Sequence, residues 1–185
     1  MSGFTQAIIV GAGGTSADVN DDGQLSVVTT SAIHQASARG DAFIIPMRDA
    51  GPAAAEYSLY IKNTNSSMDF VVSRIWSYGT DADVEWILTT VTGTAATAPA
   101  ITPVNLNRAS AKAADMTVRG GATGVTGLSP VTTIAQWFNG VANTNEYLEF
   151  DDSLVLTNGT AIAFEYQAGT GGAAILHVLG YFIDA

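Results

Sequence analysis

The segment Glu146–Asp184 reads as three β-strands in quick succession, and it constrains the fold more than any other part of the chain. Apolar runs in this segment are interrupted at Asp151-Asp152 and again at Asn158-Gly159. An Asn-Gly pair between alternating apolar residues is a strong short-range signal of a β-hairpin. After a Gly-rich stretch, a last apolar run covers Ala173–Ile183. The segment therefore predicts antiparallel sheet.

The middle of the chain holds further strand candidates, separated by polar or Pro- and Gly-containing stretches. Their Val, Ile, Trp and Tyr content favours sheet over helix. Residues 93–103 are expected to be a linker or an extended edge, 120–127 a loop, and the one helical candidate is the short segment Asn105–Asp115. The expected strands are 41–48, 56–64, 68–78, 83–92 and 131–138. This pattern predicts an all-β fold of two packed antiparallel sheets, a β-sandwich.

The chain is acidic, but its charged residues are few. There are 17 Asp and Glu residues against 7 Lys and Arg residues, which gives a net charge of −10. Nucleic acid and anionic membranes are not expected partners, because this field repels phosphate. Charged residues make up only 13% of the chain, so much of the surface is neutral. Such a surface suits either a solvated sheet or a protein packed against its own copies or another shell.

Residues 1–40 differ in composition from the rest of the chain. We expect an extended N-terminal arm here with one short strand near Gln24–Thr30, followed by one sandwich domain over residues 41–185. Without cysteine, no disulfide is available, and no export signal or membrane-spanning run is recognisable, so synthesis in a cytoplasm is expected. Apolar residues in an arm favour a covering partner. The predicted contact residues are Phe4, Ile8, Ile9 and Val10.

The stretch Ile8–Gly14 begins like the glycine-rich turn of a dinucleotide-binding domain. The third glycine of the G-x-G-x-x-G pattern is replaced by Ser16, and neither a helix nor alternating parallel strands follow. A flexible arm explains these glycines better than a nucleotide site. We therefore expect no cofactor.

A second stretch, Asp18–Gly23, imitates a calcium-binding loop. Asp18, Asn20 and Asp22 match positions 1, 3 and 5 of an EF-hand loop, and Gly23 matches the turn glycine. Position 12, which needs a bidentate Glu, is Thr29, and no helices flank the loop. The alternative is a turn whose side chains cap their own backbone. These three residues are the only metal-site candidate.

The titratable residues form no recognisable catalytic pattern. His34 and His177 lie far apart, and His177 alternates within the last strand as a structural histidine does. Motifs of the type G-x-S-x-G, H-E-x-x-H and GK[ST] are absent. Paired carboxylates occur in glycosidases but also in ordinary turns. These pairs are Asp81/Asp83 and Asp151/Asp152. No enzymatic activity is expected.

The aromatic residues allow two interpretations. On strands they usually fill a sandwich core or an interface between subunits, and when exposed they can form a platform for stacking sugars. The residues concerned are Trp76, Trp86, Trp137, Tyr57, Tyr60, Phe164 and Tyr166.

Stretches near the start, in the middle and near the end of the chain together resemble small virion proteins of tailed bacteriophages. Val19–Leu25 is similar to that family's "V-N-x-x-G-Q-L" turn, and Pro103–Ser110 contains its "N-L-N-R-x-S" pattern. Leu154–Ile162 and Val178–Phe182 are similar to its "L-x-L-x-x-G-x-x-I/L" and "V-x-G-Y-F/Y" patterns. The resemblance implies a jelly-roll-like sandwich that serves as a head decoration, fibre or tail-associated part, without catalytic residues.

Together, these expectations lead to the hypothesis that the chain is a capsid decoration or cement protein that forms a homotrimer. Its partners would be other copies of itself and the major capsid protein, on the capsid surface of the virion. The alternative is a receptor- or glycan-binding module of a head or tail fibre. In that case the loops Gly120–Gly127 and Thr92–Pro103 would carry recognition, with an exposed Trp or Tyr beside them.

Overall fold

The computed structural model describes residues 18–19, 25–26, 31–53, 55–81, 84–139, 141–167 and 172–185. It divides into two units, residues 1–32 and residues 33–185, which are described separately. In the first unit, β1 (Asp18–Val19) pairs antiparallel with β2 (Leu25–Ser26). The second unit contains the β-sandwich.

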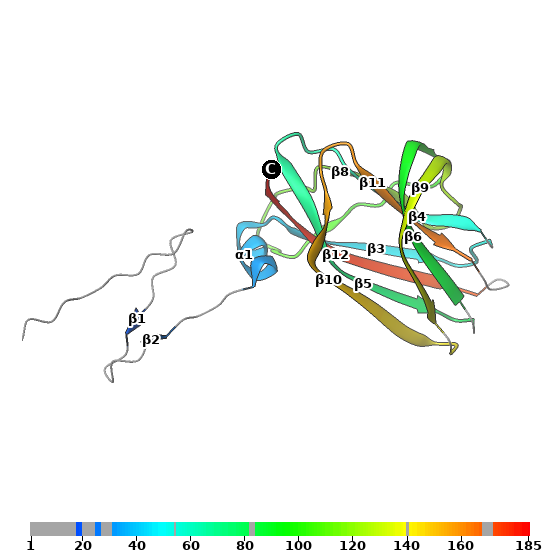
Figure 1. Ribbon diagram of the computed structural model, residues 1–185, viewed down its shortest axis with the longest axis horizontal. Helices are drawn as coiled ribbons and strands as arrows, with labels where there is room; N and C mark the ends of the chain where they lie inside the picture. Colours follow the sequence, from blue (N-terminus) through cyan, green and yellow to red (C-terminus); the bar gives the residue numbers. More distant parts are fainter. Residues whose placement is uncertain are drawn as a thin grey trace, which may run out of the picture. The chain divides into compact units, whose positions relative to one another are not determined.

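Two five-stranded antiparallel sheets pack face to face in the sandwich, with one short helix, α1 (Ala32–Arg39), beside them (Figure 1). Sheet 1 has the order β10-β5-β12-β3-β7, and sheet 2 has the order β8-β4-β11-β6-β9. The strands of sheet 1 are β10 (Thr144–Leu156), β5 (Met68–Gly79), β12 (Ala174–Asp184), β3 (Ala42–Asp49) and β7 (Val104–Asn105). The strands of sheet 2 are β8 (Met116–Gly120), β4 (Glu56–Asn63), β11 (Ala161–Tyr166), β6 (Val84–Ala96) and β9 (Thr126–Asn139).

The strand connections are those of a jelly roll. The chain is arranged as one long antiparallel hairpin in which β6 pairs with β9, and the pairs β5–β10, β4–β11 and β3–β12 follow toward the chain ends. When this hairpin is rolled up, the pairs β5–β10 and β3–β12 lie in sheet 1, and the pairs β6–β9 and β4–β11 lie in sheet 2. Pairing of β12 with β5 joins the two pairs of sheet 1, and pairing of β11 with β6 joins the two pairs of sheet 2. The predicted all-β, jelly-roll-like sandwich is therefore confirmed.

Inward-facing residues of both sheets fill one core. Trp86 packs edge to face on Tyr166 with 5.3 Å between ring centroids and lies parallel to Trp137 at 6.4 Å. Trp137 Nε1 donates a hydrogen bond of 2.9 Å to Ser77 Oγ, which in turn donates to Asn139 Oδ1 at 3.1 Å. Large aromatic rings supply much of the buried apolar area that stabilises such a core.

Helix α1 covers one end of the outer face of sheet 1. Its Ala36 is fully buried against Val71 of β5 and Tyr181 of β12, and the half-buried Ile33 and Ile183 pack on the same cluster. Val71 near the start of β5 and Tyr181 near the end of β12 are thereby buried on this face. The rest of this outer face carries no helix within the described residues.

The segment that forms α1 was predicted to belong to the extended arm, and this prediction is wrong for residues 32–39. Ser31, a favoured N-cap residue, directly precedes the helix, and no Gly or Pro interrupts it. Gly40 ends it with φ +79°. The amide of Gly40 donates to Ser37 O at 3.0 Å and that of Asp41 to Ala36 O at 2.8 Å, which is the Schellman arrangement.

Other differences concern the connection between β6 and β9. Strand β6 continues into the predicted linker and β9 begins inside the predicted loop, while β8 was not predicted. The helical candidate Asn105–Asp115 forms no helix and holds part of β7 and turns. Its Asn105 and Asn107 side chains accept hydrogen bonds from backbone amides two residues further on, which competes with helical bonding.

Candidate functional site

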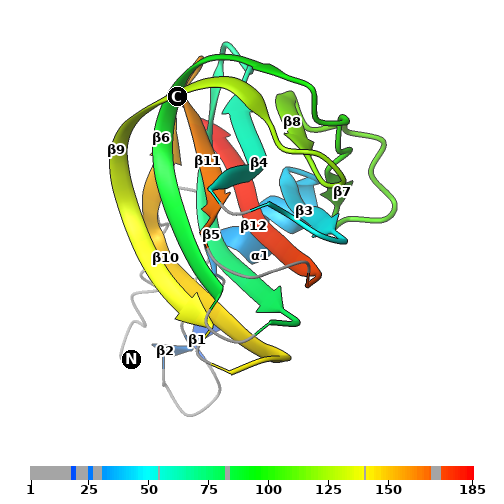
Figure 2. The same cartoon turned by 90° about the vertical axis from the view of Figure 1, so that its right-hand side faces the viewer.

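Strand β9 forms the edge of sheet 2 and exposes a row of large apolar side chains. Because β9 is the last strand in its sheet, one side of its backbone has no neighbouring strand within the described residues. In Figure 2, β9 and the sheet 1 edge strand β10 run along the same side of the sandwich. The exposed side chains are Val131 (62%), Ile134 (37%), Phe138 (58%) and, just after the strand, Val141 (64%). We call these four residues the apolar edge.

Two bulges in β9 contribute to this exposure. Leu88 pairs with Ala135 but Thr89 pairs with Thr133, so Ile134 has no partner in the ladder. Val131 is skipped in the same way between Thr132 and Pro130. Bulges and prolines commonly protect edge strands from pairing with other chains. Here the bulged residues Val131 and Ile134 are themselves apolar and exposed.

A groove of about 380 Å³ adjoins the apolar edge. It lies where β6 and β9 of sheet 2 approach the end of β10 and the turn into β11. Its apolar lining residues are Val91, Val131, Leu154, Val155, Leu156 and Ala161. The groove extends the apolar surface beyond the side chains of β9.

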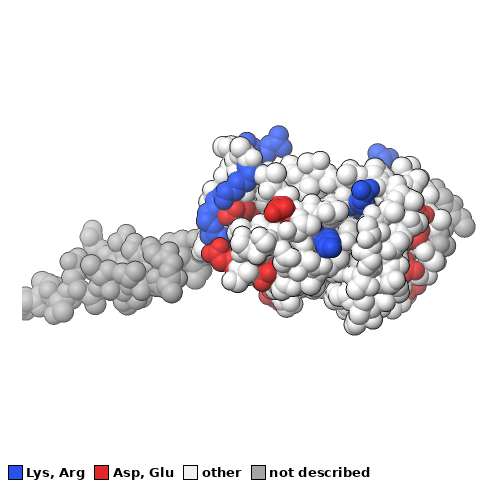
Figure 3. Space-filling view, turned by 90° about the horizontal axis from the view of Figure 1, so that it is seen from above, with Lys and Arg blue, Asp and Glu red and all other residues white. Residues whose placement is uncertain are grey.

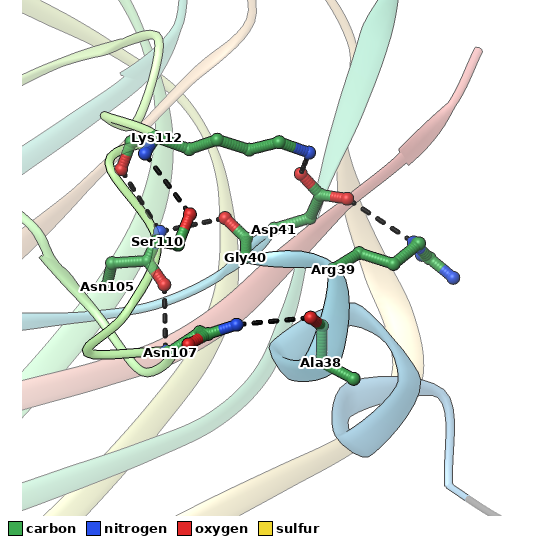
Figure 4. A network of polar contacts seen from close by, with 8 residues as sticks. All are labelled: Ala38, Arg39, Gly40, Asp41, Asn105, Asn107, Ser110 and Lys112. Atoms are coloured by element: carbon green, nitrogen blue, oxygen red, sulfur yellow. Dashed lines mark hydrogen bonds and ion pairs between the residues drawn. The ribbon is translucent and has the colours of Figure 1, made fainter.

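A second feature is a network of polar contacts that joins residues 38–41 to residues 105–112, which we call the polar clasp (Figure 4). Asn105 Nδ2 donates to Gly40 O at 2.8 Å and to Lys112 O at 3.0 Å. Asn107 Nδ2 donates to Ala38 O at 3.1 Å, which satisfies a carbonyl at the end of α1. The clasp therefore fixes the end of α1 and the start of β3 to the loop after β7.

The clasp also contains the carboxylate of Asp41, which is buried. Its Oδ1 accepts a hydrogen bond of 2.7 Å from Lys112 Nζ, and its Oδ2 accepts one of 3.3 Å from Arg39 Nε. Both basic side chains are 56% exposed, so solvent screens them and the ion pairs themselves contribute modestly. Removing both partners would leave a buried charge unpaired, which is much more costly.

The stretches of the family resemblance that lie in the sandwich contribute to its structure. The Asn105–Ser110 pattern belongs to the polar clasp. Gly180 lies in the middle of β12, where a Cβ atom would come within 2.4 Å of both Phe70 Cζ and Val71 O. Gly159 adopts φ +80° in the turn between β10 and β11. Each of these residues has a role in the fold.

Most predicted arm residues lie outside the described part of the chain. This applies to Phe4, Ile8, Ile9 and Val10, and to the glycines that follow them. Of the calcium candidates, Asp18 belongs to β1, whereas Asn20 and Asp22 are not among the described residues. No group of three or more His, Cys, Asp or Glu residues that could hold a metal ion occurs among the residues that are described.

The described acidic residues Asp81, Asp151 and Asp152 lie at a bend and at an irregularity in strand pairing. Asp151 and Asp152 lie within β10 at φ 44° and 60°, at the point where the pairing of β10 with β5 is irregular. Asp81 Oδ2 accepts a hydrogen bond of 2.9 Å from the amide of Gly172, and Asp83 is outside the described residues. His34 is exposed on α1 and His177 is half-buried on β12.

The predicted aromatic set divides between interior and surface. Trp86, Phe164 and Tyr166 are buried in the main core, and Trp137 packs against it. Tyr57 and Tyr60 belong to a cluster on the outer face of sheet 2, where burial raises the pKa of both phenols. The remaining member of the set, Trp76, is half-buried on the outer face of sheet 1.

The two loops expected to carry glycan recognition pack against sheet 2. Ala98 and Val125 are buried in the cluster that contains Tyr60. Arg119 Nη1 donates to Ala98 O at 2.8 Å, and Thr97 Oγ1 donates to Gly124 O at 2.6 Å. These contacts tie the loops to each other as a cover over the sheet. The cluster includes no tryptophan among the described residues.

The face of the described residues seen in Figure 3 is largely uncharged, in line with the low share of charged residues in the chain. In the view of Figure 3, Lys, Arg, Asp and Glu side chains are scattered and most of the visible face is neutral. Within the described residues, no helix has the length and apolar character needed to cross a membrane. Comparison of the chain with protein-family models and with curated proteins finds no match.

Proposed function

We propose that this chain is a structural protein of a bacteriophage virion, namely a decoration or cement protein that binds the outer surface of the head lattice and stabilises it. The observation that carries this proposal is the apolar edge on the outermost strand of sheet 2. A long edge strand with exposed apolar side chains is prone to self-association, and burial against a neighbouring molecule removes this liability. The jelly roll provides a rigid body that presents the edge in the same way in every copy.

The apolar edge is too small to provide tight binding alone. Full burial of one large aliphatic or aromatic side chain contributes roughly 1.5–3 kcal/mol. Because the four side chains are only 37–64% exposed, their burial supplies about 3–7 kcal/mol together, which does not exceed the cost of losing translational and rotational freedom on association. The edge therefore needs additional contacts for tight binding. We assign these contacts to the arm residues Phe4, Ile8, Ile9 and Val10, and to the multiple attachment points that a homotrimer provides.

In this proposal the partners are copies of the same chain and the major capsid protein. The apolar edge serves the contact between copies, and the arm serves the contact with the head lattice. The polar clasp then has a mechanical role, because it holds α1 and the start of β3 to the sandwich just after the arm. Force transmitted through the arm is borne by the hydrogen bonds of Asn105 and Asn107 and by the pairing of β3 with β12.

The proposal is tested by adding the purified chain to phage heads assembled without it and counting bound copies by cryo-electron microscopy. We expect high-copy occupancy across the head lattice. Deletion of residues 1–15 should abolish binding while the circular dichroism spectrum and the unfolding temperature of the sandwich remain unchanged. Binding only at a vertex or the tail, or undiminished occupancy by the truncated chain, would contradict the proposal.

A further inference from the structure

The outer face of sheet 1 beyond α1 carries a row of ring-containing side chains that the fold does not use. The strand register places Tyr147 of β10 opposite Trp76 of β5, Trp76 opposite His177 of β12, and His177 opposite Pro46 of β3. Residues directly opposite one another share one face of a sheet. Neighbouring strands lie about 4.8 Å apart, so the row of four side chains spans about 14 Å. We call these four residues the ring row.

A β-bulge is the reason why Trp76 lies outside the core. Val72 pairs with Gly180 but Arg74 pairs with Leu179, so Ser73 is skipped in the ladder. Before this point Phe70 and Val72 face inward, and after it Ile75 does. In an uninterrupted strand, Trp76 would face the same way as Val72. The bulge instead directs an indole to the surface.

Arg74 and Glu149 hold the indole in place. The guanidinium carbon of Arg74 lies 5.5 Å from the centroid of the Trp76 ring, a cation–π contact. Arg74 Nη2 also pairs with Glu149 Oε1. Arg74 and Glu149 lie opposite each other on β5 and β10, two positions along the strands from the ring row. The positive charge beside the ring is thus neutralised, and the ring row presents no net charge from this pair.

A shallow hollow of about 390 Å³ lies beside Trp76. Its lining residues are Trp76, Ser77, Tyr78, Asn145, Ile175 and His177. Tyr78 donates its hydroxyl hydrogen to Asn143 Oδ1 at 2.8 Å, which leaves the phenol oxygen able to accept. The side chains of Asn145 and His177 make no hydrogen bond to any other residue in the described part of the chain. Donors and acceptors are therefore available next to an aromatic surface.

We propose that the ring row and this hollow bind a neutral oligosaccharide. The C–H face of a sugar ring stacks on an indole, while its hydroxyl groups exchange hydrogen bonds with amide and imidazole groups of the kind that Asn145 and His177 supply. A polyanionic ligand is disfavoured by the net charge of −10. A row about 14 Å long accommodates several linked sugars across the strands. The site is distinct from the apolar edge and does not depend on the cement function.

The test uses the full-length chain on an array of neutral glycans, followed by isothermal titration calorimetry with the glycan that binds best. Trp76→Ala should weaken binding roughly tenfold or more, because stacking is lost. Trp76→Phe should recover part of the affinity, and Asn145→Ala should weaken binding with stacking retained. Phe138→Ser, on the apolar edge, is the matched control and should leave glycan affinity unchanged. Circular dichroism and thermal unfolding establish that each variant is folded.

Two results would overturn the inference. One is the absence of any neutral glycan that binds the wild-type chain at millimolar concentration. The other is glycan binding that survives Trp76→Ala in a folded variant. Loss of head binding in Trp76→Ala, with no glycan bound by the wild type, would show that this face contacts protein instead. None of these outcomes bears on the arm deletion that tests the cement function.

Discussion

Gly40 and Ser110 lie so close together that a Cβ atom on Gly40 would come within 2.2 Å of Ser110 Oγ. The two residues belong to the segments that the polar clasp joins, and Gly40 also has φ +79°, a conformation that side-chain-bearing residues rarely adopt. Close approach and backbone conformation therefore both require glycine at this position. This contact explains how the end of α1 fits against the loop after β7.

The first prediction separates these two requirements. Gly40→Ala should lower the free energy of unfolding by about 3 kcal/mol, because backbone strain and overpacking both contribute. Gly159→Ala is the matched control, since Gly159 has φ +80° but no heavy atom lies within 4 Å of the place that its Cβ would take. It should cost only about 1 kcal/mol. Urea unfolding measures both values, and equal losses would show that the approach of Ser110 is unimportant.

The second prediction concerns the clasp hydrogen bonds. Asn107→Ala should lower the free energy of unfolding by about 1 kcal/mol, because Ala38 O and the amide of Ala109 both lose a partner in solvent-exposed hydrogen bonds. Hydrogen exchange should accelerate in residues 36–41. Asn158→Ala removes one exposed hydrogen bond to Asn65 O, away from the polar clasp, and should leave hydrogen exchange in residues 36–41 unchanged. Unchanged exchange at the end of α1 would contradict the anchoring role of the clasp.

The third prediction concerns stability at alkaline pH. Burial raises the pKa of Tyr181 to about 12, and a hydrogen bond to Asp152 and its negative charge act in the same direction. Above the ordinary tyrosine pKa of about 10, the unfolded chain loses this proton before the folded chain does. The stabilisation is therefore complete below about pH 10 and is lost as the pH rises toward 12.

Unfolding temperatures recorded between pH 9 and 12 measure how steeply stability falls with rising pH. In Tyr181→Phe this slope should be smaller. Tyr57, Tyr60 and Tyr166 also have raised pKa values, so part of the slope should persist in the variant. Tyr147→Phe is the control, because Tyr147 is 65% exposed. If the Tyr181→Phe and wild-type curves stay parallel, the proton of Tyr181 does not contribute.

The fourth prediction concerns the apolar edge. Phe138→Ser should weaken self-association of the purified chain by roughly tenfold or more, because a large apolar side chain leaves the contact. The free energy of unfolding should change by less than about 0.5 kcal/mol, since the side chain is largely exposed. Analytical ultracentrifugation measures the association. Val104→Ser, an exposed apolar residue on β7, should leave it unaltered.

The sequence predicted most sheet-forming segments well, because alternating apolar residues and turn signals are local. The β-hairpin expected at Asn158-Gly159 is wrong, because β10 and β11 on either side of this turn belong to different sheets and do not pair. Helix α1 was missed because its buried face consists only of small or half-buried residues, Ala36 and Ile33, which give a weak apolar stripe. Its end at Gly40 depends on Ser110, which lies far away in the sequence. Local patterns carry no information about such a contact.

The sites were harder to predict than the fold. Trp76 and Trp86 both lie on strands rich in apolar residues, yet one lies on an outer face and the other is fully buried. The difference arises from the bulge at Ser73, whose position depends on the pairing of β5 with β12 and not on the residues around it. The apolar edge was also missed, because the sequence does not reveal which strand ends a sheet.

The rolled-hairpin order of the strands has a consequence for how the protein is made. Ala42 at the start of β3 pairs with Tyr181 near the end of β12, so sheet 1 needs both ends of the sandwich sequence before it can close. Pairings between residues so distant in sequence give a high contact order, which slows folding. During synthesis, sheet 1 therefore cannot close on β3 until β12 has left the ribosome.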